Sequence, residues 1–203
     1  MPSKNVIKID IPESYYHVYA RGVAKSVIFK DNEDYSVYLN LLKRYLSDQP
    51  VKDPLGREYP HLAAKIELLA FCLMPNHVHL LVYQYDEGMM TQLMRGVMTS
   101  YSRYFNDKYH RTGPLFESRY KASRISHDVY LRHISRYIHL NPKQWRHWEW
   151  SSLPYYREHK AEWVKPQRIL ELFDSKKAYD TFVTDYEECK EKIDIYKHQL
   201  AGE

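Results

Sequence analysis

The chain has 203 residues, 44% of them hydrophobic, and a formal net charge of +4. This composition is typical of a folded globular protein and argues against a disordered chain. The two cysteines, Cys72 and Cys189, have no CxxC spacing, which predicts neither a disulfide framework nor a cysteine zinc site. Residues 1–13 contain no apolar signal segment and no run of 18 apolar residues occurs, so we expect a cytoplasmic protein that does not enter a membrane.

Basic residues gather in one part of the chain. Between Thr91 and Trp150 there are 11 Lys and Arg against 4 Asp and Glu, whereas the remainder carries 19 against 22. Such a segment favours a polyanionic partner, although a solvated basic face would give the same pattern.

The first elements are a strand and a helix. Tyr15 to Arg21 is rich in β-forming residues and stops at Gly22, which predicts a strand. Asp31 is a good N-cap for a helix whose apolar residues recur at helical spacing from Tyr35 to Leu46. The prolines and glycine between Asp48 and His61 then predict a loop.

Two strands, a helix, a strand and a helix follow. We expect strands over Ile66 to Met74 and His77 to Tyr85, a helix from Leu93 to Phe105, a strand over Arg119 to Ile125 and a helix from Asp128 to Leu140. The last helix must stop at Asn141 because Pro142 disfavours the α conformation of the residue before it. This order predicts an α+β fold of the ferredoxin-like split βαβ type, an antiparallel sheet with helices on one face.

The C-terminal part differs from the rest. We expect one domain over residues 1–155 and a C-terminal helical extension over residues 156–203. The extension has apolar residues at helical spacing around Ile169 to Phe173, and again in a longer helix from Tyr179 that runs on through Lys190, Lys192 and Lys197.

His77 and His79 are candidate metal ligands. Alternate residues of a strand point to the same face, roughly 6.5–7 Å apart, so the two imidazoles project together. They begin a strand that continues as the apolar run Leu80 to Val82, where two polar rings need a reason. Two histidines on a polar sheet face remain the plain alternative.

The helix that ends at Asn141 offers two more candidates. Tyr137 and Asn141 lie four residues apart and therefore on one helix face. An amide oxygen suits Mg²⁺ or Mn²⁺, and a phenol beside a metal can attack phosphorus. Spacing alone does not separate Tyr137 from Tyr130, which lies two turns earlier on nearly the same face, or either from a packing residue.

Several segments together resemble one family. The run Cys72 to Val82 is similar to the HUH motif of single-tyrosine transposases, in which two histidines flank a hydrophobic residue. Further segments resemble the REP-associated tyrosine transposase branch of these IS200-like enzymes, in that branch's order: Tyr16-His17-Val18 with Arg21-Gly22, Gly113 to Phe116, Arg119 to Lys121, Tyr137 to Pro142 and Trp150 to Ser152. Together they span about two-thirds of the chain.

The resemblance implies roles for four residues. His77 and His79 would bind a divalent metal, Mg²⁺ or Mn²⁺, Asn141 would complete the metal site, and Tyr137 would be the nucleophile. It further implies a single-stranded DNA endonuclease and strand transferase that forms a 5′-phosphotyrosine intermediate and acts on DNA with REP-like hairpins. A nucleoid-associated prokaryotic protein is then expected, with a monomer favoured over a dimer.

Single-stranded DNA calls for a basic groove with aromatic stacking platforms. The aromatic candidates are Tyr101, Tyr104, Tyr120 and Trp145, and each is equally explained as a packing residue. The candidate cations are Arg95, Arg103, Arg119, Lys121, Arg124, Arg132 and Arg136. Arg119 and Lys121 are preferred because they flank Tyr120 within a resembling motif.

Two other functions compete with this interpretation. A histidine-triad nucleotide hydrolase would need a third histidine where the sequence has Leu81. A domesticated or inactive single-stranded DNA-binding protein that keeps the fold is disfavoured because all four site residues are present, yet the sequence does not exclude it.

Overall fold

The structure is a computed structural model that describes residues 10–53, 55–157 and 162–185. Its strands are β1 (Ser14–Arg21), β2 (Ile66–Met74), β3 (His77–Gln84) and β4 (Lys121–Ile125). Its α-helices are α1 (Asn32–Leu46), α2 (Met89–Lys108), α3 (Asp128–His139), α4 (Leu153–Arg157), α5 (Gln167–Leu170) and α6 (Lys176–Thr184). Among the described residues, no helix is long and apolar enough to cross a bilayer.

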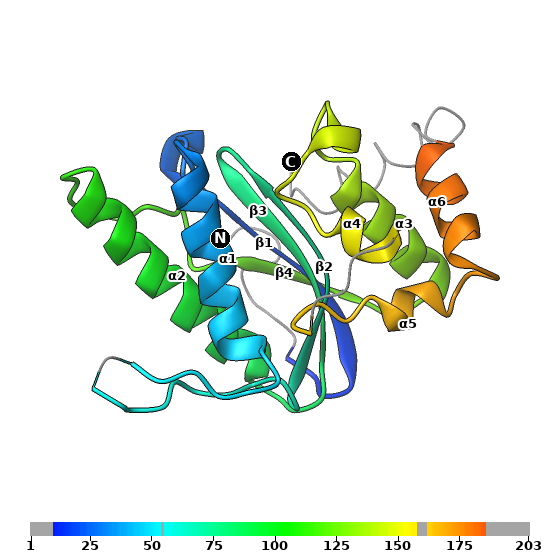
Figure 1. The fold of residues 1–203 in the computed structure, drawn as a ribbon, viewed down its shortest axis with the longest axis horizontal. Helices are drawn as coiled ribbons and strands as arrows, with labels where there is room; N and C mark the ends of the chain where they lie inside the picture. The colour runs from blue at the N-terminus through cyan, green and yellow to red at the C-terminus, as the bar shows by residue number, and fades with distance from the viewer. Residues whose placement is uncertain (1–9, 54, 158–161, 186–203) are drawn as a thin grey trace, which may run out of the picture.

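The four strands form one sheet in the order β2-β3-β1-β4, and every neighbouring pair is antiparallel. With α1 joining β1 to β2 and α2 joining β3 to β4, this is the topology that the sequence predicts (Figure 1). The α+β, ferredoxin-like fold class is therefore confirmed. In the register, His77 lies opposite Arg21 of β1 and His79 lies opposite Tyr19.

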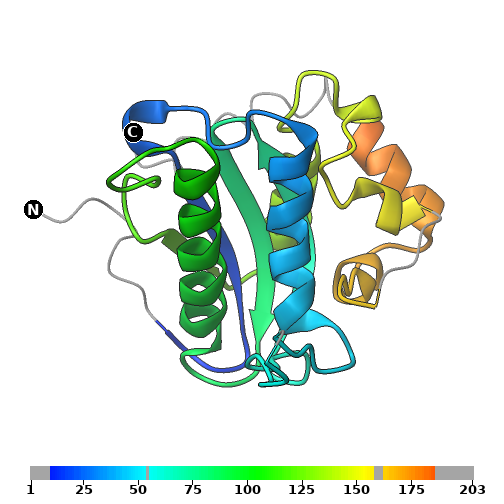
Figure 2. The same ribbon diagram turned by 60° about the vertical axis from the view of Figure 1, so that its left-hand side comes forward.

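Helices cover both faces of the sheet. The crossover helices α1 and α2 pack together on one face, as expected (Figure 2). The helix α3 packs against β2 and β3 from the opposite face, where α5 and α6 contact it (Figure 1). The expectation of helices on one face thus holds for the two crossover helices and is wrong for α3. Its apolar residues Leu131, Ile134 and Ile138 bury the second face of strands that are apolar on both sides.

The two crossover helices approach each other closely at Gly96. A Cβ atom at this position would collide with the ring and hydroxyl of Tyr45 on α1. The first turn of α1 is fixed as the sequence predicts, because the Asp31 carboxylate accepts a hydrogen bond from the backbone N–H of Asp34 at 3.0 Å.

Asp34 holds the other end of this helix pair. Its buried carboxylate accepts hydrogen bonds from the Lys30 N–H at 2.7 Å, from Tyr104 and Lys108 at 3.0 Å each, and from Tyr109 at 2.9 Å. Burial raises the pKa of Asp34, but the hydrogen bonds to its charged form lower the pKa by a larger amount, so the net pKa lies below the usual value.

Asp34→Asn is expected to lower the free energy of unfolding by about 3 kcal/mol at neutral pH, because the amide NH2 group that replaces one carboxylate oxygen would face donors such as the Lys30 N–H and the Tyr109 hydroxyl and leave them unsatisfied. A carboxyl with a lowered folded-state pKa stabilises above its unfolded value, and this stabilisation is lost as pH falls through the folded value. Urea unfolding should therefore show the deficit shrinking below about pH 4. Glu33→Gln is the control, because this exposed partner of Lys108 should contribute under about 1 kcal/mol. Equal effects of the two substitutions would contradict the assignment.

Several residues after Ser151 pack in the two hydrophobic clusters that also contain the residues of the sheet. Trp163 and Val164 pack in the cluster beneath α1 and α2, whereas Tyr156, Ile169 and Tyr179 pack in the cluster beneath α3. The segment before them pairs with β2 through hydrogen bonds from Leu73 N–H to the Trp150 carbonyl and from Ser152 N–H to the Phe71 carbonyl, both 2.9 Å. The division at residue 155 stays a prediction. The expected continuation of the last helix through Lys190, Lys192 and Lys197 lies outside the described residues.

Candidate active site

The strand β3 and the end of α3 bring the candidate residues together on the α3 face of the sheet. β3 carries His77 and His79 at alternate positions, and their rings lie 4.9 Å apart between centroids. Asn141 follows the last turn of α3, and its Oδ1 lies 3.2 Å from His77 Nε2. Residues 64 positions apart in sequence thus meet at one point, as the sequence predicts.

Tyr137 lies over His79 and over a further histidine of the sheet, His17 of β1. Its ring is perpendicular to that of His79, at 5.4 Å between centroids, and to that of His17, at 6.1 Å. Burial raises the pKa of the Tyr137 phenol, while a hydrogen bond from Asn141 and the charge of Arg21 lower it without cancelling the rise. Both opposing groups stabilise the phenolate, which is the form that attacks phosphorus.

The helix geometry separates Tyr137 from Tyr130. Seven residues of α-helix advance roughly 10 Å along the axis. Tyr130 therefore lies two turns from the end of α3 that carries Asn141, and it packs at the margin of the α3 core. The described geometry favours Tyr137, the residue that the family resemblance selects.

His79 is supported by a second buried histidine. His17 of β1 places Nε2 2.9 Å from His79 Nδ1, and the two rings stack at 5.0 Å. Burial lowers the pKa of His17 to about 3 and holds that of His79 well below its usual value, where the nearby positive charge of Arg21 adds to the effect. Both rings are therefore neutral at neutral pH, which is the state in which imidazole binds a metal.

The orientation of His77 follows from its neighbour. Asn76 donates from Nδ2 to the Lys25 carbonyl at 3.2 Å, which turns its Oδ1 toward His77 Nδ1 at 2.6 Å. His77 therefore carries its proton on Nδ1, and its Nε2 is a lone-pair acceptor. Nε2 then faces another acceptor, Asn141 Oδ1.

Two acceptors that face each other fit a cation between them. Imidazole nitrogens from His77 and His79 with the Asn141 oxygen would form a neutral set of ligands for a divalent cation, in which the amide oxygen is the hard ligand that Mg²⁺ and Mn²⁺ prefer. The contacts of His77 with Asn76 and of His79 with His17 are the kind of outer hydrogen bonds that orient metal ligands. Among the described residues, no group of three His, Cys, Asp or Glu could hold a metal, so the set depends on the amide oxygen.

The seven predicted DNA-binding cations do not share one surface. Arg95 and Arg103 lie on α2, Arg119 lies on the loop before β4, and all three are exposed. Lys121 lies on the active-site face of β4, its Nζ 5.9 Å from the Tyr19 ring. The remaining three are Arg124 at the β4 edge and Arg132 and Arg136 on α3.

Arg136 is wrongly predicted as a DNA contact. Its side chain is 1% exposed, donates to the Phe182 carbonyl at 3.1 Å, contacts His133 Nδ1 at 2.8 Å and stacks on the Phe182 ring. It is therefore a packing residue that ties α3 to α6. Tyr120 and Tyr101 are also buried, which removes Tyr101 as a stacking platform and leaves Tyr120 only as the wall of a cavity.

Arg136→Ala is expected to cost about 3 kcal/mol of unfolding free energy, because it removes a large buried side chain and its hydrogen bonds. Its effect on DNA should be nil: the salt dependence of hairpin affinity, measured by fluorescence anisotropy, should match wild type. Arg119→Ala should show the reverse, with normal stability and a logarithmic salt slope reduced by about 1. A smaller salt slope in Arg136→Ala than in wild type would instead show that Arg136 contacts a DNA phosphate.

Three residues of the site were not assigned from the sequence. His17 and Arg21 occur in the quoted motif at the first strand, and Asn76 precedes the HUH histidines, but none was given a role. Alternation along β1 puts His17 and Arg21 on one face of the strand, and this could be inferred from the sequence alone. That this face lies beside His77 and His79 depends on the pairing of β1 with β3.

Comparisons with known proteins found a family model and solved structures that are similar to this chain. Residues 59–141 match the family model described as "Transposase IS200 like". A solved structure described as "Structure of the REP associates tyrosine transposase bound to a REP hairpin" is 15% identical, with a TM-score of 0.55 over 78% of this chain and 89% of that chain. A crystal structure of a Deinococcus radiodurans R1 protein assigned as a transposase is 15% identical, with a TM-score of 0.39 over 65% of this chain and 92% of that one. No curated protein matches the chain significantly.

Proposed function

Residues 59–141 match the model of the IS200-like transposase family, and on this ground we propose that the chain cleaves and rejoins single-stranded DNA by metal-dependent transesterification. The observation that carries the proposal is the position of Tyr137. Its phenol lies beside an imidazole pair on the sheet and beside the amide of Asn141, which directly follows its own helix. This is a nucleophile placed next to a set of neutral metal ligands.

Each residue has a defined part in the proposed reaction. The Tyr137 oxygen forms a bond to phosphorus as the bond from phosphorus to the 3′ oxygen breaks, and the released 3′ oxygen takes up a proton. The product is a 5′-phosphotyrosine, which a 3′-OH reverses without ATP. Asn141 and Arg21 stabilise the phenolate before attack. His77, His79 and Asn141 would hold Mg²⁺ or Mn²⁺, which would polarise the scissile phosphate and offset its developing charge.

Burial of the site favours this chemistry. Tyr137 and His79 are 7% and 6% exposed, so few water molecules compete with the phosphate for the nucleophile. Lys121 and Arg21 lie on the same sheet face and supply positive charge where the DNA backbone must pass. The rigid helix end and sheet place the groups before the substrate arrives, which is how such sites accelerate phosphoryl transfer.

The proposed substrate is a hairpin with single-stranded flanks. The similar solved protein is described as bound to a REP hairpin, and an equivalent ligand is proposed for this chain. Action as a monomer, and the division of the chain at residue 155, remain predictions of the sequence.

An adduct assay tests this function. The full chain with Mn²⁺ or Mg²⁺ and a labelled single-stranded hairpin oligonucleotide should form an SDS-resistant protein–DNA adduct, and EDTA should prevent it. Fully duplex DNA of the same sequence is the control and should give none. Hairpin binding without any adduct would instead support an inactive DNA-binding protein, and adduct formation that survives EDTA would remove the metal from the proposal.

A further inference from the structure

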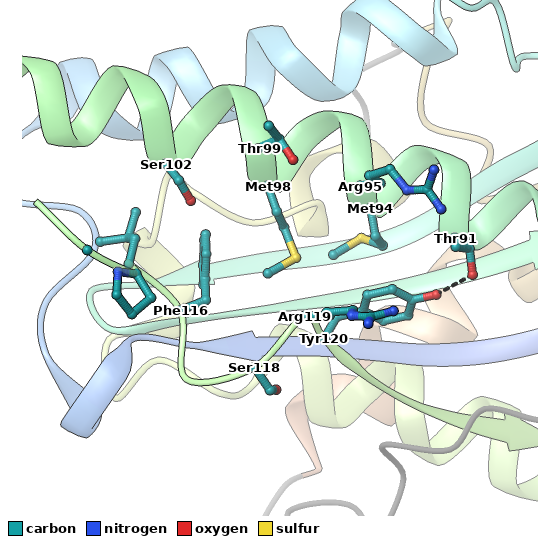
Figure 3. A pocket seen from close by; sticks show the side chains of 13 residues that line it. Thr91, Met94, Arg95, Met98, Thr99, Ser102, Phe116, Ser118, Arg119 and Tyr120 are labelled. Carbon is teal, nitrogen blue, oxygen red and sulfur yellow. Dashed lines mark hydrogen bonds between the residues drawn. The ribbon is translucent and has the colours of Figure 1, made fainter.

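A cavity of about 380 Å³ lies between α2 and the loop of residues 113–120 (Figure 3). This volume is at the small end of ligand pockets, which range from roughly 300 to 1,000 Å³. Met94 and Met98 point from α2 toward the ring of Phe116, and the ring of Tyr120 closes one end. The cavity lies on the α1–α2 side of the sheet and is separate from the imidazole pair.

Its walls suit a flat aromatic ligand. Two thioethers and two aromatic rings form the apolar surface, and thioethers adapt their shape to aromatic rings. The Tyr120 ring is held in place because its hydroxyl and that of Thr91 are hydrogen bonded at 2.7 Å. Hydroxyl groups of Thr99 and Ser102 also line the cavity, where they can pair with polar edges of a heterocycle.

Two cations stand at the same end of the cavity. Arg95 and Arg119 are exposed, line the cavity and lie near Tyr120 (Figure 3). Neither guanidinium forms an ion pair with another residue in the described ranges. An apolar cavity for a ring beside two free guanidinium groups matches the parts of a nucleotide, a base and its phosphate.

The cavity is connected to the active site through the chain. Its loop pairs with the end of β1, where Glu117 N–H donates to the Arg21 carbonyl at 2.9 Å and Val23 N–H donates to that of Leu115 at 3.0 Å. Tyr120 is followed at once by Lys121, which begins the edge strand β4 and whose side chain lies on the active-site face. A DNA strand that leaves the active site past Lys121 thus reaches Arg119 by crossing one sheet edge.

We propose that this cavity receives an unpaired nucleobase from a single-stranded flank of the hairpin, with Arg95 and Arg119 on its phosphates. The inference rests on the proposed function, because it takes DNA as the substrate. It adds a binding site for one base outside the catalytic centre. A base seated there would fix the position of the hairpin relative to Tyr137.

An abasic scan tests the cavity. Affinity of the full chain for a labelled hairpin oligonucleotide is measured by anisotropy, with each flanking nucleotide replaced in turn by an abasic residue. One or two positions should lose roughly 5- to 150-fold in affinity, the range for one base stacked on aromatic side chains. Met98→Trp fills the cavity. It should lower the affinity for the intact oligonucleotide to that for the abasic one, so that abasic substitution causes no further loss.

Matched variants keep the result interpretable. Ser102→Phe also fills the cavity from a half-buried position and serves if Met98→Trp does not fold. Gln92→Phe adds a ring on the exposed surface of α2 outside the cavity and should keep the full penalty. Arg95→Ala should weaken intact and abasic oligonucleotides alike.

The experiments distinguish a wrong assignment of the cavity from a wrong assignment of the function. If wild type forms the covalent adduct but no flank position shows a base penalty, or the penalty survives in both filled variants, the cavity does not hold a base. If wild type neither binds the hairpin nor forms the adduct, the proposed function fails and the cavity proposal falls with it.

Discussion

Tyr137→Phe is expected to abolish the SDS-resistant adduct while leaving hairpin binding largely intact. The substitution removes only the phenolic oxygen, and a ring of the same shape still packs against His79 and His17. Loss of a nucleophile typically lowers the rate by more than about 10³-fold, since nothing else forms the covalent bond. Adduct yield on denaturing gels and affinity by anisotropy, measured on the same preparation, separate chemistry from binding.

Tyr130→Phe is the matched control on the same helix. It removes the same atom two turns earlier and should leave the adduct yield at the wild-type level. The reverse pattern, with the adduct lost in Tyr130→Phe and kept in Tyr137→Phe, would move the nucleophile to Tyr130. Stability should change by only about 1 kcal/mol in Tyr137→Phe, the usual contribution of one hydrogen bond.

The sequence predicts the order of elements well because each has a strong local signal. The strands over 66–74 and 77–84 are apolar runs separated by Pro75-Asn76, and the helix of residues 128–139 ends before Pro142. Local patterns do not say which sheet face a helix covers, so α3 was placed with α1 and α2. The apolar stripe of α3 identifies its buried side, whereas the choice of face depends on the connection after β4.

The candidate site was predictable to the extent that motifs carry it. His77, His79, Tyr137 and Asn141 were named, and the structure places them together. The outer contacts were not predictable, because His17 meets His79 across 62 residues of sequence and only the strand register brings them together. Burial of Arg136 was missed for a related reason: a basic residue on a helix reads as exposed until α6 is known to cover it.

The outer hydrogen bonds of the histidines bear on the proposed metal site. Asn76 fixes the tautomer of His77, and His17 leaves only Nε2 of His79 for a ligand. His17 Nδ1 is buried and has no hydrogen-bond partner among the described residues, which costs folding free energy. Apolar side chains in place of the His17–His79 pair would avoid this cost if the pair served packing alone. Two oriented, neutral imidazoles are more readily explained by a shared cation than by packing.

Removing a ligand of this set should therefore weaken metal binding itself. His77→Ala is expected to weaken Mn²⁺ binding, measured by calorimetry without DNA, by more than about tenfold, and to lower adduct formation by more than about 100-fold. His147→Ala, an exposed histidine in the turn after α3, is the control and should bind Mn²⁺ as wild type does. Equal Mn²⁺ affinity in His77→Ala and wild type would exclude His77 as a ligand.

Asn141 allows a sharper test, because its amide has two functions that different substitutions separate. Its oxygen faces His77 Nε2, and its hydrogen bond to Tyr137 lowers the pKa of the phenol, which assigns that contact to the donating amide nitrogen. Asn141→Leu should lose both Mn²⁺ binding and the adduct. Asn141→Asp keeps an oxygen ligand and adds negative charge, so it should bind Mn²⁺ at least as tightly as wild type. The same carboxylate cannot donate to the phenol and repels the phenolate, so adduct formation should still fall; full activity in Asn141→Asp would show that the hydrogen bond to Tyr137 does not assist attack.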